Sequence, residues 1–477
     1  MFFGRENDLS QLERLWRKSV PSLVTCRGRR RIGKSTLIEE FAARSHARLL
    51  EIEGLPPQPS QTNQDQLDHF AEQLCEQSDW KGGGFASWYE ALLALDQVIG
   101  EERTVVLLDE ISWMGAHDEN FPGVLKTMWD RRLKKHAHLV FVLCGSVSTW
   151  IQDNILNSTG FVGRAALNLV VGELPLKDCL KFWGTAAERL SAREILDVLS
   201  VTGGVPRYLE EVDPALSAIE NIQNMCFSPK ALLRDDFSKI FNSVFGANAA
   251  VKQRILRTLA QTPLSVSEIA SAIGMEKCGA ISKHLDQLSV AGFVMAETGH
   301  NPLTQKPAKN IRYRIRDNYS RFFLKYIAPN AALIDRDAFT CTALDALPGW
   351  DALMGYQFEN LVINNLPALL PRLGLGRALL LSAAPYRQQP TARKKGCQID
   401  LLLQTESSVC IVEIKRRKEI GLEVEREIRE KVARLAVKRG VSVRTALVYE
   451  GNLSPRLEAT AYVDHLVDFS SLLFAEG

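Results

Sequence analysis

The residues whose spacing most clearly indicates chemistry form a glycine loop near the N-terminus. The segment GRRRIGKST fits the pattern GxxxxGK[ST] and contributes six candidate nucleotide-binding residues: Gly28, Ile32, Gly33, Lys34, Ser35 and Thr36. Glycines let backbone N–H groups close around phosphates, and the start of a helix favours an anion. We expect Lys34 to neutralise β- and γ-phosphate charge and Ser35 to hold Mg²⁺.

Two carboxylates follow a second apolar run, at residues 104–108. Asp109 is expected to bind the Mg²⁺ ion, and Glu110 to polarise the water that attacks the γ-phosphate. Glu110 therefore favours hydrolysis over binding alone. The simpler alternative is an acidic turn between a strand and a loop. The sequence contains no NKxD motif, which favours ATP over GTP.

Three further polar residues are candidates for contact with the nucleotide. Ser146 follows the apolar run at residues 139–143, where it either senses the γ-phosphate or only caps the turn. Arg164 and Arg207 are each expected either to stabilise transition-state charge or to serve a structural purpose. For Arg164, the nucleotide could belong to the same subunit or to a neighbour.

A second group with catalytic potential lies near the C-terminus. Glu413 and Lys415 are two residues apart and so share one face of a predicted strand, and Asp400 lies in the preceding strand. Asp400 and Glu413 could bind a divalent metal that activates water, with Lys415 positioning the nucleophile or stabilising the developing charge. The alternatives are a salt-bridged surface strand or a domain that only binds.

The elements around these residues predict an α/β chain. Short apolar runs at residues 22–26, 104–108 and 139–143 alternate with helical patterns, which indicates buried parallel strands. Strands return at residues 378–382, 399–403 and 409–414 and are followed by a helix at 423–436 and a strand at 445–449. We therefore predict three domains: 1–215 with lid helices at its C-terminal end, 216–330, and 331–477.

The middle segment predicts a winged helix-turn-helix. A capping box at Ser265 precedes the second of three helices, and two strands around a basic loop follow them. From residue 293 to 316 there are five basic residues, Arg312 and Arg314 among them, and one acidic residue, a local charge of 5 − 1 = +4, and we expect these cations of the wing to contact DNA phosphates. Residues expected to face DNA on the third helix are Ser282, Lys283, His284 and Gln287. Alternatively, the module only packs on the ATPase as a lid.

Overall composition is that of a globular protein. The chain has 477 residues, 46% of them hydrophobic, and a net charge of +2, which neither requires nor excludes nucleic acid. None of its nine cysteines forms a CxxC pair, which argues against a zinc finger. The absence of a signal peptide and of an apolar run of membrane-spanning length predicts a cytoplasmic protein without a membrane partner.

These motifs together resemble known families. The N-terminal part resembles the archaeal-type ATPases of the AAA+/STAND branch of P-loop NTPases, on five segments: Phe3-Gly4-Arg5-Glu6, the glycine loop, Leu108-Asp109-Glu110, Cys144-Gly145-Ser146 and Gly203-Gly204-Val205-Pro206. The resemblance implies that residues 3–5 lie near the adenine, and that a winged helix follows the ATPase core.

The C-terminal part resembles the PD-(D/E)XK nuclease superfamily over about residues 350–450. The resemblance implies a restriction-endonuclease-like α/β domain with the order helix, three strands, helix, strand. It implies Glu359 as an added metal ligand on the first helix, and Lys431 on the later helix as support. Basic residues between 393 and 418, at a local charge of 7 − 3 = +4, suit a phosphate backbone.

We therefore expect a DNA-acting ATPase with a metal-dependent nuclease domain, using ATP, Mg²⁺ and, at the nuclease-like site, Mg²⁺ or Mn²⁺. Genome defence and repair are compatible roles. The alternative is a nucleotide-dependent switch that binds DNA or protein without cutting, alone, as a homo-oligomer or with a protein partner. A small-molecule P-loop kinase is a weaker third hypothesis.

Overall fold

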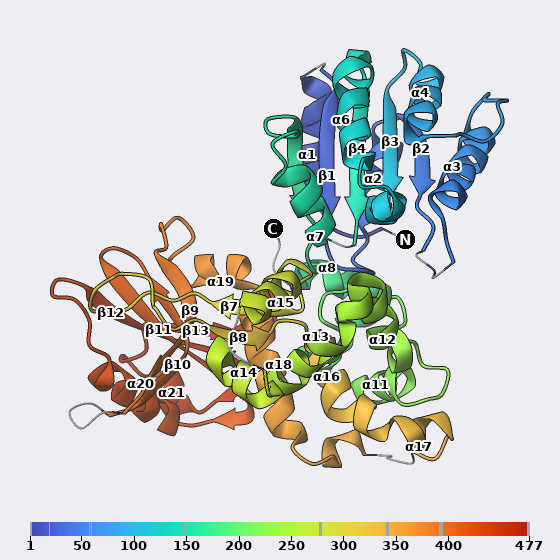
Figure 1. The fold of residues 1–477 in the computed structure, drawn as a ribbon. Coiled ribbons are helices and arrows are strands. Elements are labelled where there is room, and N and C mark those ends of the chain that lie inside the picture. The colour runs from blue at the N-terminus through green and yellow to red at the C-terminus, as the bar shows by residue number, and fades with distance from the viewer. Residues whose placement is uncertain are drawn as a thin grey trace. The chain divides into compact units, whose positions relative to one another are not determined.

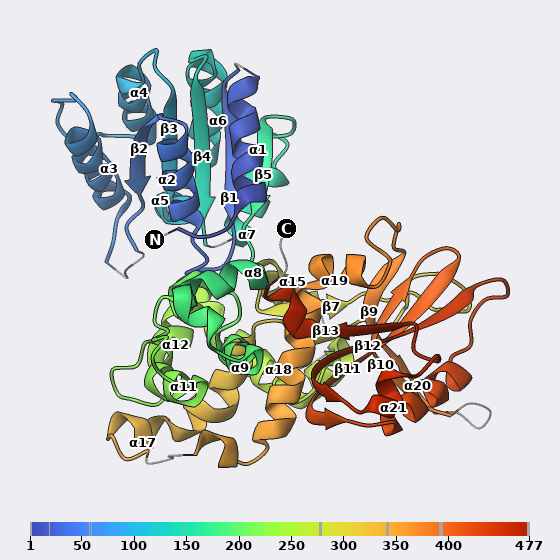
Figure 2. The same cartoon turned by 180° about the vertical axis from the view of Figure 1, so that it is seen from behind.

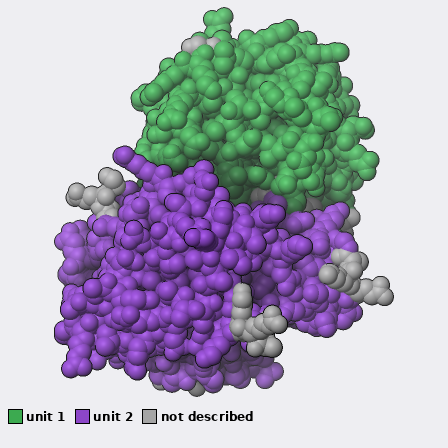
Figure 3. Space-filling view, turned by 90° about the vertical axis from the view of Figure 1, so that its left-hand side faces the viewer, with its two compact units in different colours: residues 1–174, 205–207, 238–249 green, residues 175–204, 208–237, 250–477 purple. Residues whose placement is uncertain are grey.

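A computed structural model describes residues 2–18, 20–56, 58, 60–146, 148–275, 279–339, 343–390 and 395–474. Its contacts divide the chain into two compact units (Figure 3). The first unit comprises residues 1–174, 205–207 and 238–249, and the second comprises 175–204, 208–237 and 250–477. The first division therefore falls at residue 174, whereas the sequence predicted a boundary at 215. Each unit is described separately below.

The first unit is built on a five-stranded parallel sheet. Its strands are β1 (Ser22–Arg27), β2 (Arg48–Glu53), β3 (Thr104–Asp109), β4 (Leu139–Gly145) and β5 (Ala165–Val170). They lie in the order β2-β3-β4-β1-β5, and every neighbouring pair is parallel. The carboxyl ends of all five strands therefore share one edge of the sheet, where ligands bind in open α/β folds.

Helices cover both faces of this sheet (Figures 1 and 2). One face carries α1 (Glu6–Arg17) and α2 (Lys34–Arg44), joined by stacking of Trp16 on Phe41. The other face carries α3 (Asn63–Gln77), α4 (Trp88–Val98) and α6 (Phe121–Arg131), whose apolar side chains form the main core cluster with β3 and β4. Two short helices, α5 (Ile111–Met114) and α7 (Ser148–Ile151), follow the strand ends.

The second unit contains the predicted winged helix-turn-helix. Its helices are α13 (Ala249–Leu259), α14 (Val266–Ile273) and α15 (Gly279–Val290), and its small antiparallel sheet has the order β6 (Leu264–Ser265), β8 (Arg312–Ile315), β7 (Val294–Glu297). The capping box at Ser265 is present, with Glu268 as its partner, and Gly274 ends α14 at a φ of 65°.

Further helices occur between and after these elements in the sequence. They are α8 (Leu176–Cys179), α9 (Ala192–Thr202), α10 (Pro206–Leu209), α11 (Ala218–Cys226), α12 (Leu232–Phe245), α16 (Asn318–Phe322), α17 (Ala331–Asp335), α18 (Trp350–Asn364) and α19 (Leu366–Arg372). Within the second unit, α18 packs against α9, α16 and the C-terminal sheet.

The C-terminal sheet has the order β13 (His465–Asp468), β12 (Ser442–Leu453), β11 (Ser408–Ile420), β10 (Cys397–Gln404), β9 (Ser382–Gln388). Strand β10 is antiparallel to both β9 and β11, whereas β12 runs parallel to β11 and β13 runs parallel to β12. Helix α20 (Glu423–Arg434) joins β11 to β12, and α21 (Pro455–Glu458) follows. The element order from α18 onward is helix, a further short helix, three strands, helix, strand.

One strand prediction in this region is wrong. The apolar run at residues 378–382 was predicted to be a strand, but β9 begins only at Ser382 and Leu379 is 87% exposed. An apolar run of this length does not by itself distinguish a strand from a connecting loop.

Candidate functional site

The glycine loop lies at the carboxyl edge of the parallel sheet, between β1 and α2. Gly28 has a φ of 159°, and a Cβ there would lie 2.4 Å from the carbonyl oxygen of Val171. Because that obstacle is backbone, only glycine fits without displacing the segment after β5. Arg5 donates from Nη2 to the carbonyl oxygen of Ile32 at 2.9 Å, which fixes the N-terminal segment against the loop.

The predicted phosphate and Mg²⁺ residues converge at this edge. Lys34 begins α2, is 7% exposed, and donates from Nζ to the carbonyl oxygen of Arg29 at 3.3 Å. The Ser35 hydroxyl donates to Oδ2 of Asp109 at the end of β3. A hydroxyl and a carboxylate in direct contact are the donor types that P-loop proteins use for Mg²⁺, so these residues fit the ion.

Glu110 lies beside them in a left-handed backbone conformation, with φ 46°. Its Oε2 accepts from the Ser146 hydroxyl at 2.8 Å and from the Ser146 backbone N–H at 3.1 Å. Arg30 Nε lies 3.7 Å from Oε1, and its guanidinium stacks 5.0 Å from the Trp113 ring centre. The structure thus brings Glu110 and Ser146 together, and adds a cation that the sequence analysis did not single out.

A second residue overlooked in the sequence is Glu53, at the end of β2. Burial and the nearby Asp109 and Glu110 raise the pKa of Glu53, and Arg30 lowers it. Burial also raises the pKa of Glu51 to about 7, with Glu39 and Asp109 adding to the effect. The only sequence signal was two acidic residues within an otherwise apolar strand, LLEIE.

The two candidate arginines lie in different environments. Arg164 precedes β5 and pairs with Asp130 through Nε and Nη2 at 2.9 and 2.8 Å. Since β5 is parallel to β1, Arg164 lies at the edge opposite the glycine loop, about 20 Å away along a six-residue strand. It is therefore not part of the nucleotide edge of its own unit. Arg207 follows Pro206, whose ring would lie 3.9 Å from a Cβ on Gly33.

The C-terminal candidates converge on neighbouring strands of the second unit. Leu401 of β10 pairs with Val412 of β11, so the next residues, Asp400 and Glu413, face each other. Oδ2 of Asp400 accepts the backbone N–H of Ile414 at 3.0 Å. Glu413 is 1% exposed, so its charge requires compensation.

Two lysines supply that compensation. Lys415 Nζ lies 2.8 Å from Oε1 of Glu413 and 2.8 Å from Oε2 of Glu427. Lys431, on α20, donates to Oε2 of Glu413. Both carboxylate oxygens of Glu413 therefore have a lysine partner.

Helix α18 carries a third carboxylate, that of Glu359, which interacts electrostatically with those of Asp400 and Glu413. Burial raises the pKa of Glu359 to about 7, with Asp400 and Glu413 contributing, while Arg314 and Arg321 act in the opposite direction. Burial and Glu413 raise the pKa of Asp400 to about 6. In the part of the chain that is described, no three His, Cys, Asp or Glu side chains are grouped closely enough to hold a metal ion.

The winged helix differs from the expectation in its charges. On α15, Lys283 is exposed, but His284 Nδ1 lies 3.2 Å from Nζ of the buried Lys252. Burial and the two lysines lower the pKa of His284. Arg314, predicted to contact phosphate from the wing, is 4% exposed, and Arg312 donates to the carbonyl oxygen of Pro263 at 2.8 Å.

The predicted basic surface near the nuclease-like residues is also largely neutralised. Arg416 is bound by Asp197 and lies 3.4 Å from Glu450, and Arg417 lies 3.6 Å from Glu423. Two other members of the predicted surface, Arg393 and Lys394, are outside the described residues. The net charge of the segment does not reveal these ion pairs, because a partner such as Asp197 lies far away in the sequence.

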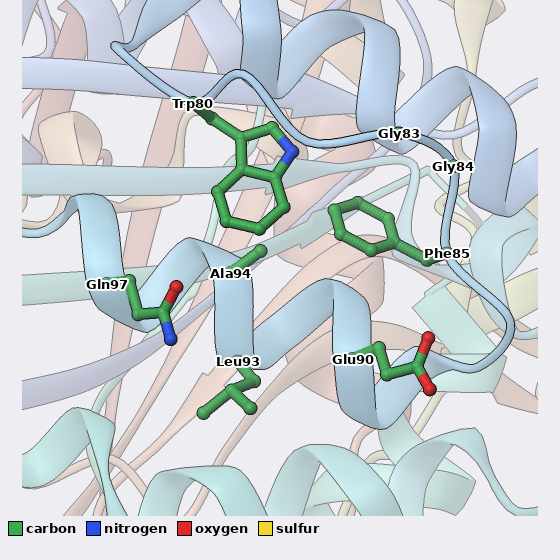
Figure 4. Close-up of a pocket in the computed structure, with 8 residues that line it drawn as sticks. All are labelled: Trp80, Gly83, Gly84, Phe85, Glu90, Leu93, Ala94 and Gln97. Atoms are coloured by element: carbon green, nitrogen blue, oxygen red, sulfur yellow. The ribbon is translucent and has the colours of Figure 1, made fainter.

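A separate cavity of about 260 Å³ lies beside α4 in the first unit (Figure 4). The rings of Trp80 and Phe85 lie over α4, with their centres 5.8 Å apart. Glu90 and Gln97 line the cavity from near the two ends of α4. It contains none of the predicted site residues.

The comparisons with known proteins agree with the N-terminal and central assignments. Residues 2–212 match the family described as "ATPase domain predominantly from Archaea", and residues 251–295 match "Bacterial regulatory protein, arsR family". The chain carries an archaeal-type ATPase domain and an ArsR-type helix-turn-helix. This confirms the resemblance over the first part of the chain and the predicted winged helix, a DNA-binding fold.

Individual relatives extend this picture. The chain is 23% identical over 364 residues to the uncharacterized protein MJECL04 of Methanocaldococcus jannaschii, which covers 75% of this chain and 76% of that protein. It is 44% identical over 41 residues to the uncharacterized ATP-binding protein MJ0423 of the same organism, covering 9% and 70%. It is also similar in fold to the Walker-type ATPase PABY2304 of Pyrococcus abyssi, with a TM-score of 0.50, 16% identity and coverage of 68% and 96%. No helix in the described ranges is both long and apolar enough to cross a membrane.

Proposed function

We propose that this protein binds and hydrolyses ATP, binds DNA, and cleaves it at a metal-dependent nuclease site in the C-terminal sheet. The ATPase part is supported by the contact between Ser35 and Asp109 and by Glu110, which is held at the end of β3 by Ser146. A carboxylate fixed next to the γ-phosphate position can orient the attacking water. Arg207 is our candidate for contact with the phosphates.

One observation carries the nuclease proposal: the buried Glu413 and the half-buried Asp400 face each other across neighbouring strands, and lysines lie beside Glu413. The pKa of Asp400, raised to about 6 by burial and by Glu413, reflects the cost of holding two negative charges together. A divalent cation would remove that cost, so Asp400 and Glu413 are the residues that would hold it, and the side chain of Glu359 would have to move closer to join them. When bound, such an ion lowers the pKa of a water molecule and stabilises developing phosphate charge.

The chain's own residues have defined parts in this proposal. Lys415 orients Glu413 and holds a positive charge where a scissile phosphate would approach. Lys431 contacts the other oxygen of Glu413 and is a positioning residue. The order of helix, strands, helix and strand from α18 to β12 supports the likeness to PD-(D/E)XK domains.

A second function, DNA binding without cleavage, is favoured by the same lysines. Because both oxygens of Glu413 have lysine partners, the carboxylate is already neutralised without a metal. In this second function, ATP binding would control a module that binds nucleic acid and does not cut it.

The test is cleavage of supercoiled plasmid, linear duplex and single-stranded DNA with Mg²⁺ or Mn²⁺, each with and without ATP. We expect Glu413→Gln to lower cleavage at least ~100-fold, because the site would lose a negative charge that holds the ion and so the activation of the attacking water. Glu427→Gln is the matched control, since Glu427 shares Lys415 but is 41% exposed. Lys34→Ala tests whether ATP controls cleavage.

The outcomes separate the two functions. Cleavage lost in Glu413→Gln and retained in Glu427→Gln supports the nuclease. Absence of cleavage in every condition, with DNA binding and ATP hydrolysis intact, supports the non-cleaving switch. Cleavage that persists in Glu413→Gln means that the site is elsewhere or that the preparation is contaminated.

A further inference from the structure

A cavity of about 580 Å³ lies within the second unit, where the wing loop meets strand β9. One wall is formed by the segment from Glu297 to Arg312, and the other by residues 385–389. Its volume is within the range of pockets that hold small ligands, roughly 300–1,000 Å³. It is far too small for a DNA duplex, whose major groove alone is about 12 Å wide.

The lining of the cavity is strongly basic. Its four cationic side chains are Lys306, Lys309, Arg312 and Arg387, against one carboxylate, Glu297. Several amide groups and the ring of Tyr386 complete the wall. Cations, amide donors and an aromatic ring are the groups that bind phosphates and stack on bases in single-stranded nucleic acid.

Polar atoms in the wall lack hydrogen-bond partners among the described residues. They include Nε of Arg387 and Nδ1 of His300, both buried. A buried donor without a partner costs free energy unless a ligand or water satisfies it. Glu297 lies near Arg387, Arg314 and Arg312, and its burial raises the pKa of its carboxyl.

Hydrogen bonds hold the two walls in place. His300 donates its backbone N–H to Oγ of Ser382 at 3.2 Å, and its carbonyl oxygen accepts from Nε2 of Gln404 at 2.7 Å. Gln305 donates to the carbonyl oxygen of Glu406 at 2.8 Å. The wing loop is therefore fixed to the C-terminal sheet, and the cavity does not require the wing to move.

One buried side chain connects the cavity with the carboxylate site. Arg314 interacts electrostatically with Glu297 and Arg387 at the cavity, and with Tyr356 and Glu359 on α18. Glu359 in turn interacts with Asp400 and Glu413. Strand pairing brings the two regions together as well, because Tyr386 of the cavity wall pairs with Ile399, the residue before Asp400.

We infer that this cavity binds a short single-stranded segment of nucleic acid, one or two nucleotides long, next to the site at Asp400 and Glu413. This inference rests on the proposed function for its substrate class, but it concerns binding and needs no metal. Phosphates would contact Lys306, Lys309 and Arg387, and a base would lie against Tyr386.

The test is the affinity of the full chain for a fluorescent 12-nucleotide oligothymidylate in EDTA, measured by anisotropy. The double variant Lys306→Glu with Lys309→Glu should bind ~20-fold or more weakly, and its slope of log affinity against log salt should fall by about 1.4, or ~0.7 for each lost phosphate contact. Arg387→Gln should weaken binding several-fold. The charge-matched control is Lys135→Glu with Lys325→Glu, two exposed lysines outside the cavity.

Each outcome bears on the inference separately from the nuclease. Equal affinity of the double variant and the wild type, or equal loss in the control, overturns the inference. A loss for a 24-base-pair duplex as large as that for the single strand also overturns it. If the variant loses oligonucleotide while no Glu413-dependent cleavage exists, the inference stands and the proposed nuclease fails. If cleavage depends on Glu413 while the double variant binds the oligonucleotide as the wild type does, the proposed nuclease stands and the inference fails.

Discussion

The two candidate sites hold their carboxylates in different ways. In the ATPase unit, Asp109 and Glu110 follow the end of a strand and contact hydroxyl groups, Ser35 and Ser146. In the C-terminal sheet, Glu413 lies within a strand, is buried, and contacts two lysines. The carboxylates of the first site contact neutral hydroxyl groups at a sheet edge, whereas the carboxylate of the second site is already compensated by two positive charges.

This contrast indicates how the charge balance of each site depends on its ligands. A site at the carboxyl edge of a parallel sheet needs few internal ion pairs, because loops and helix N-termini supply donors to the incoming phosphates. A buried carboxylate pair must be neutralised within the fold, so substrate or metal binding there competes with existing partners. The predictions below test that difference.

The largest effect is expected at the ATPase edge. Glu110→Gln should lower ATP hydrolysis by ~100-fold or more, because an amide cannot accept a proton from water. ATP binding should change little, since Glu110 contacts Ser146 and the side chain of Arg30, and the substitution leaves the phosphate-binding residues Gly28, Lys34 and Ser35 in place. Steady-state phosphate release and nucleotide binding together check this. Glu40→Gln on the same unit's α2, where Glu40 pairs with Arg44, is the control.

Gly28→Ala should disturb the nucleotide-binding edge of the parallel sheet through steric overlap. The added Cβ would lie 2.4 Å from the Val171 carbonyl oxygen, so the loop or the segment after β5 must move. We expect a loss of about 1–3 kcal/mol, the usual cost of overpacking, seen as weaker ATP binding and a lower melting temperature. Gly83→Ala has nothing within 4 Å of its Cβ and should be neutral. Unchanged ATP affinity in Gly28→Ala would show that the loop shifts freely.

Replacing the carboxyl group of Glu359 with a neutral group should stabilise the second unit. The folded pKa of Glu359, about 7, lies above the ordinary value of 4.5. The stability contributed by its protonation is complete below pH 4.5 and is lost as pH rises through 7. Glu359→Gln should therefore raise stability by about 1–3 kcal/mol at pH 8 and change little at pH 4.

Thermal unfolding at both pH values checks this prediction. Stabilisation of equal size at pH 4 would mean that packing, and not charge, is responsible. Addition of Mn²⁺ to the wild type at pH 8 should raise the melting temperature if the carboxylates bind the ion, and Glu359→Gln should reduce that shift.

Much of the first site could be predicted because its information is local. The glycine loop, Asp109 and Glu110 are short contiguous motifs attached to strands that read as unbroken apolar runs. The two strands missing from the prediction, β2 and β5, are the edge strands of the sheet. Edge strands are covered less completely than central ones and carry polar residues, so the apolar-run criterion does not detect them.

The second site was only partly predictable, because its electrostatics arise from convergence. Asp400, Glu413 and Lys415 could be found from strand spacing, but the buried Arg314 comes from the wing and was expected to face phosphate. Nothing in the local sequence shows that Arg314 interacts electrostatically with Tyr356 and Glu359 of α18. The pairing of Arg416 with Asp197 likewise joins residues more than two hundred positions apart.

The smallest effect is expected for Arg164→Ala. Two nitrogens of its guanidinium bind Asp130, and the residue lies at the sheet edge opposite the glycine loop. An ion pair that remains partly exposed to solvent contributes little to stability, so ATP hydrolysis by dilute protein should change by less than ~3-fold. Asp130→Asn is the matched variant, because it removes the partner and keeps the arginine. A fall of ~100-fold in Arg164→Ala, confined to concentrations at which the wild type self-associates, would instead assign Arg164 to the nucleotide of a neighbouring subunit.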